Sequence, residues 1–272
     1  MDGLLDPDGS DGGLVMSVDY DKNKPVGATK EMVVVHPMME MFNKYHKQNL
    51  QCSIDEGAPP VPFGAREYFD RHGYMIIKNL YDPKKLYRPV PQERGQITYW
   101  GKRLDEFIYQ EEEQQVNGSI ATYTHPQYRE AHNQVRFILE DILGEKLYNT
   151  YYYDRYYFKG QRLVRHRDRD ACEISVSIQI SSNRESPWSF GIETPNGKEL
   201  ACNLQDGWGL LYKGCERDHW REPLESRYVR KRDKLRRWLS YRDNDDTYHH
   251  QIFFHYVRAN GPRAHCAWDK TR

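Results

Sequence analysis

The chain has 272 residues and a formal net charge of zero, because 40 lysine and arginine side chains balance 40 aspartate and glutamate side chains. This balance gives no global field that would favour nucleic acid or an anionic membrane, and no apolar run reaches the length of a membrane span. The mean hydropathy is −0.94, but 13% of the residues are aromatic, which favours a packed core over disorder. Five cysteines without a CxxC spacing predict a reduced, cytoplasmic protein.

The first part of the chain predicts a leader and a lead-in to the main domain. Residues 1–30 are rich in glycine and aspartate, a composition typical of a flexible leader. Residues 31–64 contain "HPMMEMFNKYHKQNL", whose apolar residues recur at helical spacing, and they predict a helical lead-in. "REYFDRHGYMIIKNL" then predicts a short helix, a turn at Gly73 and a buried strand over residues 74–80.

A longer helix is predicted over "THPQYREAHNQVRFILEDILG". Pro126 suits the first turn of a helix, and Gly144 suits the position just after its last residue. His132 lies off the apolar stripe of this helix, so we expect it to face solvent. The stripe consists of Tyr128, Val135, Ile138, Leu139 and Ile142.

Strand patterns dominate the chain after Lys146, separated by Gly, Pro and Asn turns. They include "KLYNTYYYDRYYF", "CEISVSIQI", "WSFGIET", "GWGLLYKG" and "HHQIFFHYV". In "CEISVSIQI" the apolar residues at 174, 176, 178 and 180 alternate with Ser175, Ser177 and Gln179, as in a half-buried strand. Strands that follow helices in this way predict a mainly β domain over residues 65–272, a sandwich or jelly roll with N-terminal supporting helices.

Directly before that alternating strand stands "HRDRD". His166 and Asp168 are two positions apart, so both side chains leave the same face if the strand extends back through them. One interpretation is an ion pair with a neighbouring arginine at 165, 167 or 169. The other is a metal site completed by His219, since two imidazoles and one carboxylate form the facial triad that binds non-haem Fe(II). The spacing alone leaves both interpretations open.

A resemblance favours the metal site. "YFKGQRLVRHRD", "CEISVSIQI", "DGWGLLYKGCERDHWREPL" and "QIFFHYV" resemble Fe(II)/2-oxoglutarate-dependent dioxygenases of the prolyl-4-hydroxylase-like branch, and most of all an uncharacterised group with "YKGCE…HWREP". The similarity spans roughly residues 65 to 260. It implies a double-stranded β-helix with iron bound by His166, Asp168 and His219, and with O₂ and 2-oxoglutarate as cosubstrates. It also implies hydroxylation of a substrate C–H, because halogenating relatives lack the carboxylate that Asp168 provides.

The distal carboxylate of 2-oxoglutarate needs a cation inside the barrel, and a guanidinium is its natural partner. Many members of the family carry this cation about ten residues after the distal histidine, and this chain departs from that pattern. Arg221 lies two residues after His219 and would share its face on a strand, so it is the favoured anchor, with Arg227 and His249 as alternatives. The resemblance also implies that Tyr157 binds the same carboxylate. A surface pair of Arg221 with Glu222 or Asp218 is the competing interpretation.

The segment 225–248 looks like an insertion after the distal ligand. It carries eight basic and five acidic residues with interleaved aromatic residues. One interpretation is a lid over the iron site for an acidic peptide, a phosphate-bearing substrate or a single nucleic-acid strand. The other is a solvated helix. The substrate itself stays open, small molecule or peptide. A non-catalytic jelly-roll protein, cupin- or lectin-like, would also account for the strands, but it does not need Arg221 and Tyr157 to converge on one interior point.

Overall fold

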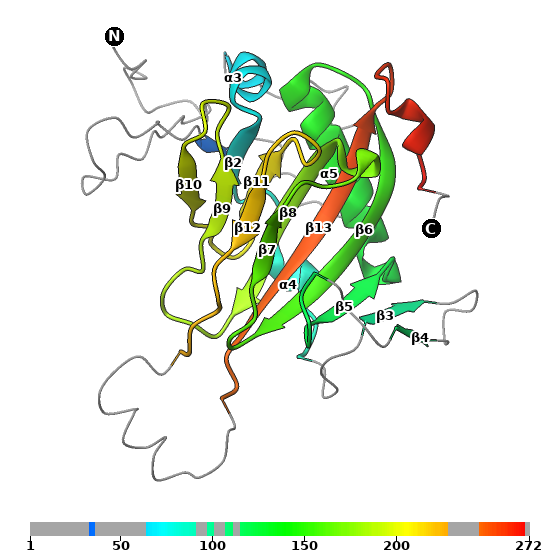
Figure 1. The fold of residues 1–272 in the computed structure, drawn as a ribbon. Helices are drawn as coiled ribbons and strands as arrows, with labels where there is room; N and C mark the ends of the chain where they lie inside the picture. The colour runs from blue at the N-terminus through cyan, green and yellow to red at the C-terminus, as the bar shows by residue number, and fades with distance from the viewer. Residues whose placement is uncertain are drawn as a thin grey trace, which may run out of the picture.

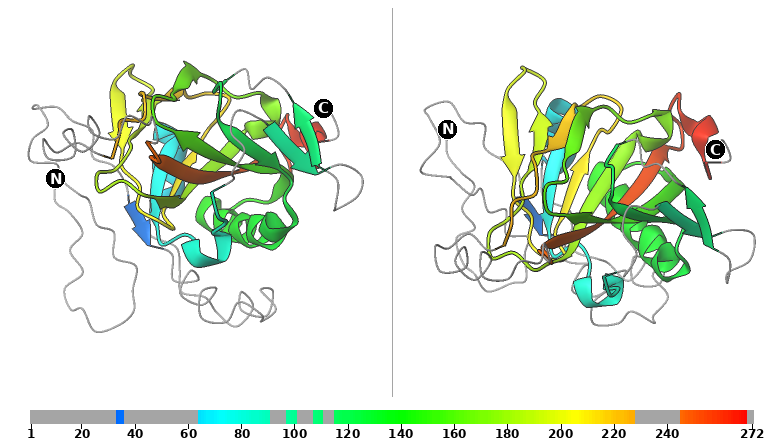
Figure 2. Two further views of the ribbon diagram at one scale, coloured as in Figure 1. Left: turned by 90° about the horizontal axis from the view of Figure 1, so that it is seen from below. Right: turned by 60° about the horizontal axis from the view of Figure 1, so that its bottom comes forward.

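Two β-sheets lie face to face in the computed structural model, with helices on one outer side (Figures 1 and 2). The structure describes residues 33–35, 64–90, 97–100, 107–110, 115–227 and 245–269. The predicted leader, most of the predicted helical lead-in and the centre of the charged segment therefore lie outside the described residues, while residues 33–35 form a strand. The elements are β1 (Val33–Val35), α3 (Ala65–His72), β2 (Tyr74–Lys78), α4 (Pro83–Leu86), β3 (Ile97–Trp100), β4 (Phe107–Gln110), β5 (Ile120–Tyr123), η1 (Pro126–Tyr128), α5 (Arg129–Leu143), β6 (Leu147–Phe158), β7 (Leu163–His166), η2 (Asp170–Cys172), β8 (Ile174–Ser182), β9 (Phe190–Glu193), β10 (Glu199–Cys202), β11 (Gly209–Tyr212), β12 (His219–Arg221), β13 (Tyr248–Arg258) and η3 (Ala264–Cys266).

The chain passes repeatedly between the two sheets, and this alternation defines the fold. The larger sheet has the order β1-β2-β11-β8-β13-β6-β5-β3-β4, and the smaller sheet has the order β10-β9-β12-β7. From β6 onward the chain goes to the small sheet at β7, back at β8, over again for β9 and β10, and so on to β13. Neighbouring strands from β6 to β13 pair antiparallel. The predicted fold class, a double-stranded β-helix with supporting helices, is confirmed.

The alternating pattern of β8 decides which way its two faces point. Its apolar side chains pack in one buried cluster with residues of α3 and α5, and Figure 2 shows α5 on the side of the large sheet away from the small sheet. Burying each such side chain contributes about 1.5–3 kcal/mol. The polar face of β8 therefore points into the space between the two sheets, where Ser175 and Ser177 are fully buried.

Both predicted helices begin and end close to the expected residues. Gly73 and Gly144 follow α3 and α5 with φ angles of 75° and 65°, the left-handed conformation that favours glycine at a helix end. The prediction for His132 was wrong, because this residue is only 3% exposed. Its Nε2 lies 3.1 Å from the carbonyl oxygen of His255, and its ring packs on Phe254 and Tyr256. A helix pressed against a sheet of aromatic residues can thus bury a polar residue beside its apolar stripe.

A buried ionic group holds the segment after α4 against the outer face of the large sheet. Asp154 on β6 is fully buried and accepts two hydrogen bonds from the guanidinium of Arg88, at 2.9 and 3.1 Å. Nε2 of His250 lies 2.8 Å from the same carboxylate. Burial lowers the pKa of His250 even though Asp154 opposes the shift, so the neutral ring donates this bond. The charge of Arg88 is therefore balanced by Asp154 alone within this group.

We expect Asp154→Asn to lower the free energy of unfolding by about 3 kcal/mol, because it leaves the partly buried guanidinium of Arg88 without its anion. Urea unfolding of the metal-free protein measures the difference. Asp70→Asn is the control, since that carboxylate is 51% exposed and lies 3.7 Å from Arg66, and exposed pairs contribute little. Equal effects of the two substitutions would contradict this view of the group.

Within the described residues, no helix combines the length and the apolar character that crossing a membrane requires.

Candidate metal centre

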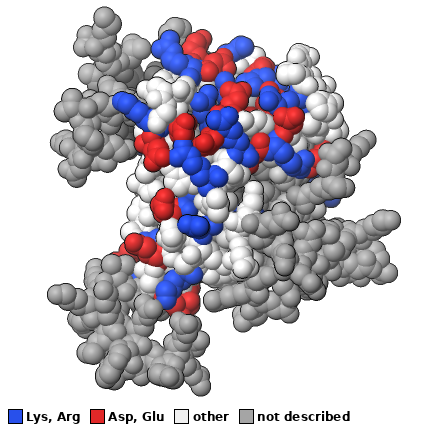
Figure 3. Space-filling view, viewed as in Figure 1, with Lys and Arg blue, Asp and Glu red and all other residues white. Residues whose placement is uncertain are grey.

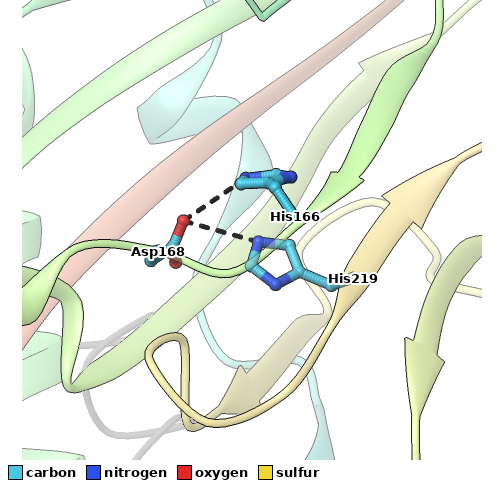
Figure 4. A group of neighbouring side chains, drawn as sticks. All are labelled: His166, Asp168 and His219. Carbon is cyan, nitrogen blue, oxygen red and sulfur yellow. Dashed lines mark ion pairs between the residues drawn. The ribbon is translucent and has the colours of Figure 1, made fainter.

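Strand pairing brings His166 and His219 side by side. His166 is the last residue of β7 and His219 the first of β12, and the two are direct partners in the antiparallel register. Asp168 lies in the link between β7 and η2, with its amide N–H donating to the carbonyl of Gly214 at 2.9 Å. β8 does not extend back through these residues, so the expectation that one strand presents both was wrong: the link turns Asp168 toward the histidines (Figure 4).

The three side chains converge on one point (Figure 4). Oδ1 of Asp168 lies 3.4 Å from Nε2 of His166 and 3.5 Å from Nε2 of His219. One ligand atom from each residue lies within 4.8 Å of the others. This compact set of two imidazole nitrogens and one carboxylate oxygen is the donor combination of a facial triad.

Backbone hydrogen bonds fix the orientation of both rings. Nδ1 of His166 lies 2.7 Å from the carbonyl oxygen of Val164, and Nδ1 of His219 lies 3.0 Å from that of Arg217. A carbonyl oxygen only accepts, so each Nδ1 carries the proton and donates. In the neutral ring each Nε2 then presents a lone pair toward Asp168, which is how histidine ligands are prepared for a metal.

The pKa values of the acid and the buried imidazole move in opposite directions. Burial alone raises the pKa of Asp168, but the charge of a protonated His219 and the nearness of His166 outweigh it and hold the pKa below its usual range. Burial likewise lowers the pKa of His219, yet Asp168 raises it more strongly, so the net shift is upward. Without metal, Asp168 and His219 therefore stabilise each other's charged forms as an ion pair.

Metal binding should consequently weaken as the pH falls. A metal must displace the proton from His219, whose pKa is raised above its ordinary value of about 6.5 by Asp168. We expect the affinity for Co²⁺ to be clearly higher at about pH 8 than at about pH 6. Calorimetric titration of the metal-free protein in buffers of equal ionic strength measures it, and a pH-independent affinity would show that these imidazoles are not ligands.

The arginines next to His166 do not take Asp168 as their partner. Arg165 pairs with Glu193, Glu199 and Asp218. Arg167 pairs with Asp218, and Arg169 pairs with Asp269. Basic and acidic side chains are interspersed over the face that Figure 3 shows. The three arginines of "HRDRD" and its preceding residue thus form ion pairs with acids elsewhere in the chain. Asp168 contacts the two histidines instead.

Arg221 is fully enclosed on the interior side of the small sheet. Its side chain is 1% exposed and donates to the carbonyl oxygen of Trp188 and, at 2.6 Å, to Oε1 of Gln251 on the opposite sheet. The guanidinium lies over the rings of Trp188 and Phe190 at 4.5 and 5.1 Å. The ring of Phe190 also stacks on His219 at 5.6 Å, so Arg221 and His219 face the same interior space.

No carboxylate among the described residues pairs with Arg221. Asp218 pairs with Arg165 and Arg167, and the Nε atom of Arg221 has no hydrogen-bond partner in the described part of the chain. Burial lowers the pKa of Arg221 to about 10, so the group keeps its charge at neutral pH. An enclosed guanidinium without an anion is costly, and this one is suited to an anionic ligand.

The other candidates for the anchor lie in different settings. Tyr157 on β6 is fully buried, packs edge-on against Trp188 at 5.0 Å, and its hydroxyl accepts from Arg155 at 3.4 Å. His249 on β13 is buried beside Arg221, and burial together with that cation drives its pKa well below 6.5. A neutral ring attracts an anion weakly. Arg227 pairs at 2.7 Å with Asp246 at the surface.

Several residues at the centre went unrecognised in the sequence. Trp188 and Gln251 form the immediate surroundings of Arg221, and Ser175 and His255 lie behind Asp168. The serines of β8 gave one usable signal, since polar residues that alternate with isoleucine mark a strand face that is not hydrophobic core. Gly214 in "YKGCE" gave no such signal, and only the structure shows that a Cβ there would collide with Oδ2 of Asp168.

No protein-family profile matches the chain, and no curated protein matches it in sequence. Solved structures do show similarity. A Pseudomonas putida prolyl-4-hydroxylase is 12% identical, with 72% of this chain and 97% of that chain covered and a TM-score of 0.43. A 2OG-Fe(II) oxygenase family member from Burkholderia pseudomallei is 11% identical, with 83% and 96% covered and a TM-score of 0.47.

A third similar structure is HygX from Streptomyces hygroscopicus with nickel and 2-oxoglutarate bound, which is 11% identical, with 72% of this chain and 87% of that chain covered and a TM-score of 0.43.

Proposed function

We propose that this protein is an Fe(II)- and 2-oxoglutarate-dependent dioxygenase that hydroxylates a C–H bond of its substrate. The donor set supports the metal: two Nε2 atoms with their lone pairs turned inward and one carboxylate oxygen meet at one point. Such a set leaves coordination positions open for a cosubstrate and O₂. The chemistry of the residues therefore fits Fe(II).

The observation that carries the proposal is the enclosed guanidinium of Arg221, which lies beside this donor set and has no carboxylate partner among the described residues. Two positions along a strand correspond to about 6.5–7 Å, an offset that suits a cosubstrate chelated at one end and anchored at the other. A binding protein that only holds a metal has no use for a buried cation at this position. The geometry thus favours a dicarboxylate such as 2-oxoglutarate.

In this proposal the protein positions reactants and excludes water. When bound, iron supplies O₂ activation coupled to the oxidation of 2-oxoglutarate to succinate and CO₂. Val164 and Arg217 hold the imidazoles through backbone carbonyls, and Arg221 orients the cosubstrate by a charge-assisted pair. The rings of Phe190 and Trp188 cover the guanidinium, and surroundings of low dielectric strengthen such a pair.

The test is a turnover assay without substrate, in which the purified protein is given Fe(II), 2-oxoglutarate, ascorbate and O₂. We expect succinate to form slowly, and to stop when the metal is chelated. If the protein binds metal but neither binds nor consumes 2-oxoglutarate, the protein is instead a non-catalytic jelly-roll protein that holds a metal. Substrate screening should then start from peptides and small molecules, with single-stranded nucleic acid as a separate arm.

We further propose that the protein works in a reducing compartment such as the cytoplasm. The described cysteines Cys172, Cys202, Cys215 and Cys266 are all free thiols. A protein of an oxidising compartment is expected to pair at least some of its cysteines.

A further inference from the structure

The carboxylate of Asp168 uses its two oxygens for different partners. Oδ1 faces the two histidines. Oδ2 points the other way, toward the polar face of β8, where the hydroxyl of Ser175 lies 3.4 Å away. A carboxylate that can turn freely offers a metal either one oxygen or both. The surroundings of Oδ2 therefore decide how Asp168 binds.

Ser175 is itself held by a second residue from another strand. Its Oγ lies 2.9 Å from Nδ1 of His255 on β13, and 3.1 Å from the carbonyl oxygen of Cys172. Both Ser175 and His255 are buried. A hydroxyl has one proton to donate and two lone pairs to accept with. If Nδ1–H of His255 donates to Oγ, the hydroxyl proton has two acceptors within reach, the carbonyl oxygen of Cys172 and Oδ2 of Asp168, and the charged oxygen is the stronger acceptor.

Gly214 closes the space on the remaining side of Oδ2. A Cβ at this position would lie 2.4 Å from Oδ2 and 2.8 Å from Oγ of Ser175, so no side chain fits without moving the carboxylate. The same residue accepts the amide N–H of Asp168 at 2.9 Å. The link that carries Asp168 is thus held against the β11–β12 loop by its backbone and against β8 by its side chain.

We propose that Ser175 and His255 are positioning residues that hold Asp168 as a one-oxygen ligand. The hydrogen bonds run from Nδ1 of His255 to Oγ of Ser175 and from there to Oδ2 of Asp168, which keeps Oδ2 away from the metal. This assignment rests on the metal centre proposed above. It explains why β8 carries a serine at 175 where its partner strand carries a histidine at 255 in direct register.

Co²⁺ binding to the full-length metal-free protein tests this assignment, because the visible spectrum of the bound ion reports its coordination. Ser175→Ala should weaken Co²⁺ binding about 10- to 100-fold, as loss of a partner behind a ligand usually does, and should change the spectrum as Oδ2 swings in. His255→Leu should do the same, while His255→Asn, whose amide nitrogen replaces Nδ1, should recover much of both. Gly214→Ala should also weaken binding.

Ser181→Ala is the matched control, a serine near the far end of the same strand, and it should leave affinity and spectrum unchanged. Ser175→Ala removes one oxygen and is expected to fold, which circular dichroism checks. If Ser175→Ala and His255→Leu bind Co²⁺ with wild-type affinity and spectrum, the positioning role is wrong although the metal centre stands. If the wild-type protein binds no Co²⁺, the metal centre and the positioning role are both wrong.

Discussion

Replacing His166 or Asp168 with alanine should abolish iron-dependent formation of succinate while the protein stays folded. Each substitution removes one of three donors, and we expect turnover to drop by more than about 100-fold, the upper end of what outer-shell changes cause. Both side chains are partly solvated, with 21% and 13% exposed, so their truncation costs little packing energy. Succinate formation and thermal unfolding, measured on the same samples, separate loss of activity from loss of fold.

The control for these variants is His265→Ala, which removes a surface imidazole in the C-terminal η3 turn. It should turn over like the wild type. Asp168→Gly in the presence of chloride is a further variant, since removal of the carboxylate leaves room for a halide. We expect this variant to lose the turnover of the wild type as well. Normal turnover in any of the three ligand variants would mean that the ligands have been assigned wrongly.

Arg221→Leu should raise the apparent KM for 2-oxoglutarate strongly while metal binding survives. Truncating one partner of a buried charge pair costs about 2–5 kcal/mol, which corresponds to roughly 30- to 5,000-fold in KM. The guanidinium is 1% exposed and has no carboxylate partner among the described residues, so an incoming carboxylate is its natural counterion. Steady-state kinetics and calorimetry with 2-oxoglutarate give the effect, and Co²⁺ titration shows whether the metal site is intact.

Arg227→Leu is the matched control, because Arg227 pairs with Asp246 and its side chain is 34% exposed. It should change the KM little. Should Arg227→Leu raise the KM while Arg221→Leu has no effect, the anchor belongs to the segment 225–248, and the interpretation of that segment as a substrate lid fails as well.

The sequence predicted those parts of the fold that local patterns determine. The alternation in β8, the stripe in α5 and the glycines at 73 and 144 act within a few residues, and the structure agrees with each of them. His132 was mispredicted because its burial comes from β13, which lies more than a hundred residues further along the chain. A helical period shows which face is apolar, but it does not show how wide a face the neighbouring sheet covers.

The same distinction between local patterns and tertiary contacts applies to the candidate metal centre. The H-x-D spacing placed His166 near Asp168, but only the pairing of β7 with β12 shows why His219, among the 11 histidines, is the one beside them. Ser175 and His255 come from two strands whose register no spacing in the sequence expresses. Residues behind a ligand are chosen by tertiary contact, so they become visible only once the strands are in place.

The position of β7 in the small sheet has a mechanical consequence. Among the strands that the structure describes, β7 is the outermost of that sheet and pairs only with β12. His166 and His219 lie opposite each other in this pairing. A bound metal would therefore cross-link the edge strand β7 to β12. Amide hydrogen exchange along residues 163–166 should slow when metal is added, and the melting temperature should rise with the logarithm of metal concentration. Amide hydrogen exchange of β7 would then report whether the centre holds a metal, even while the substrate is unknown.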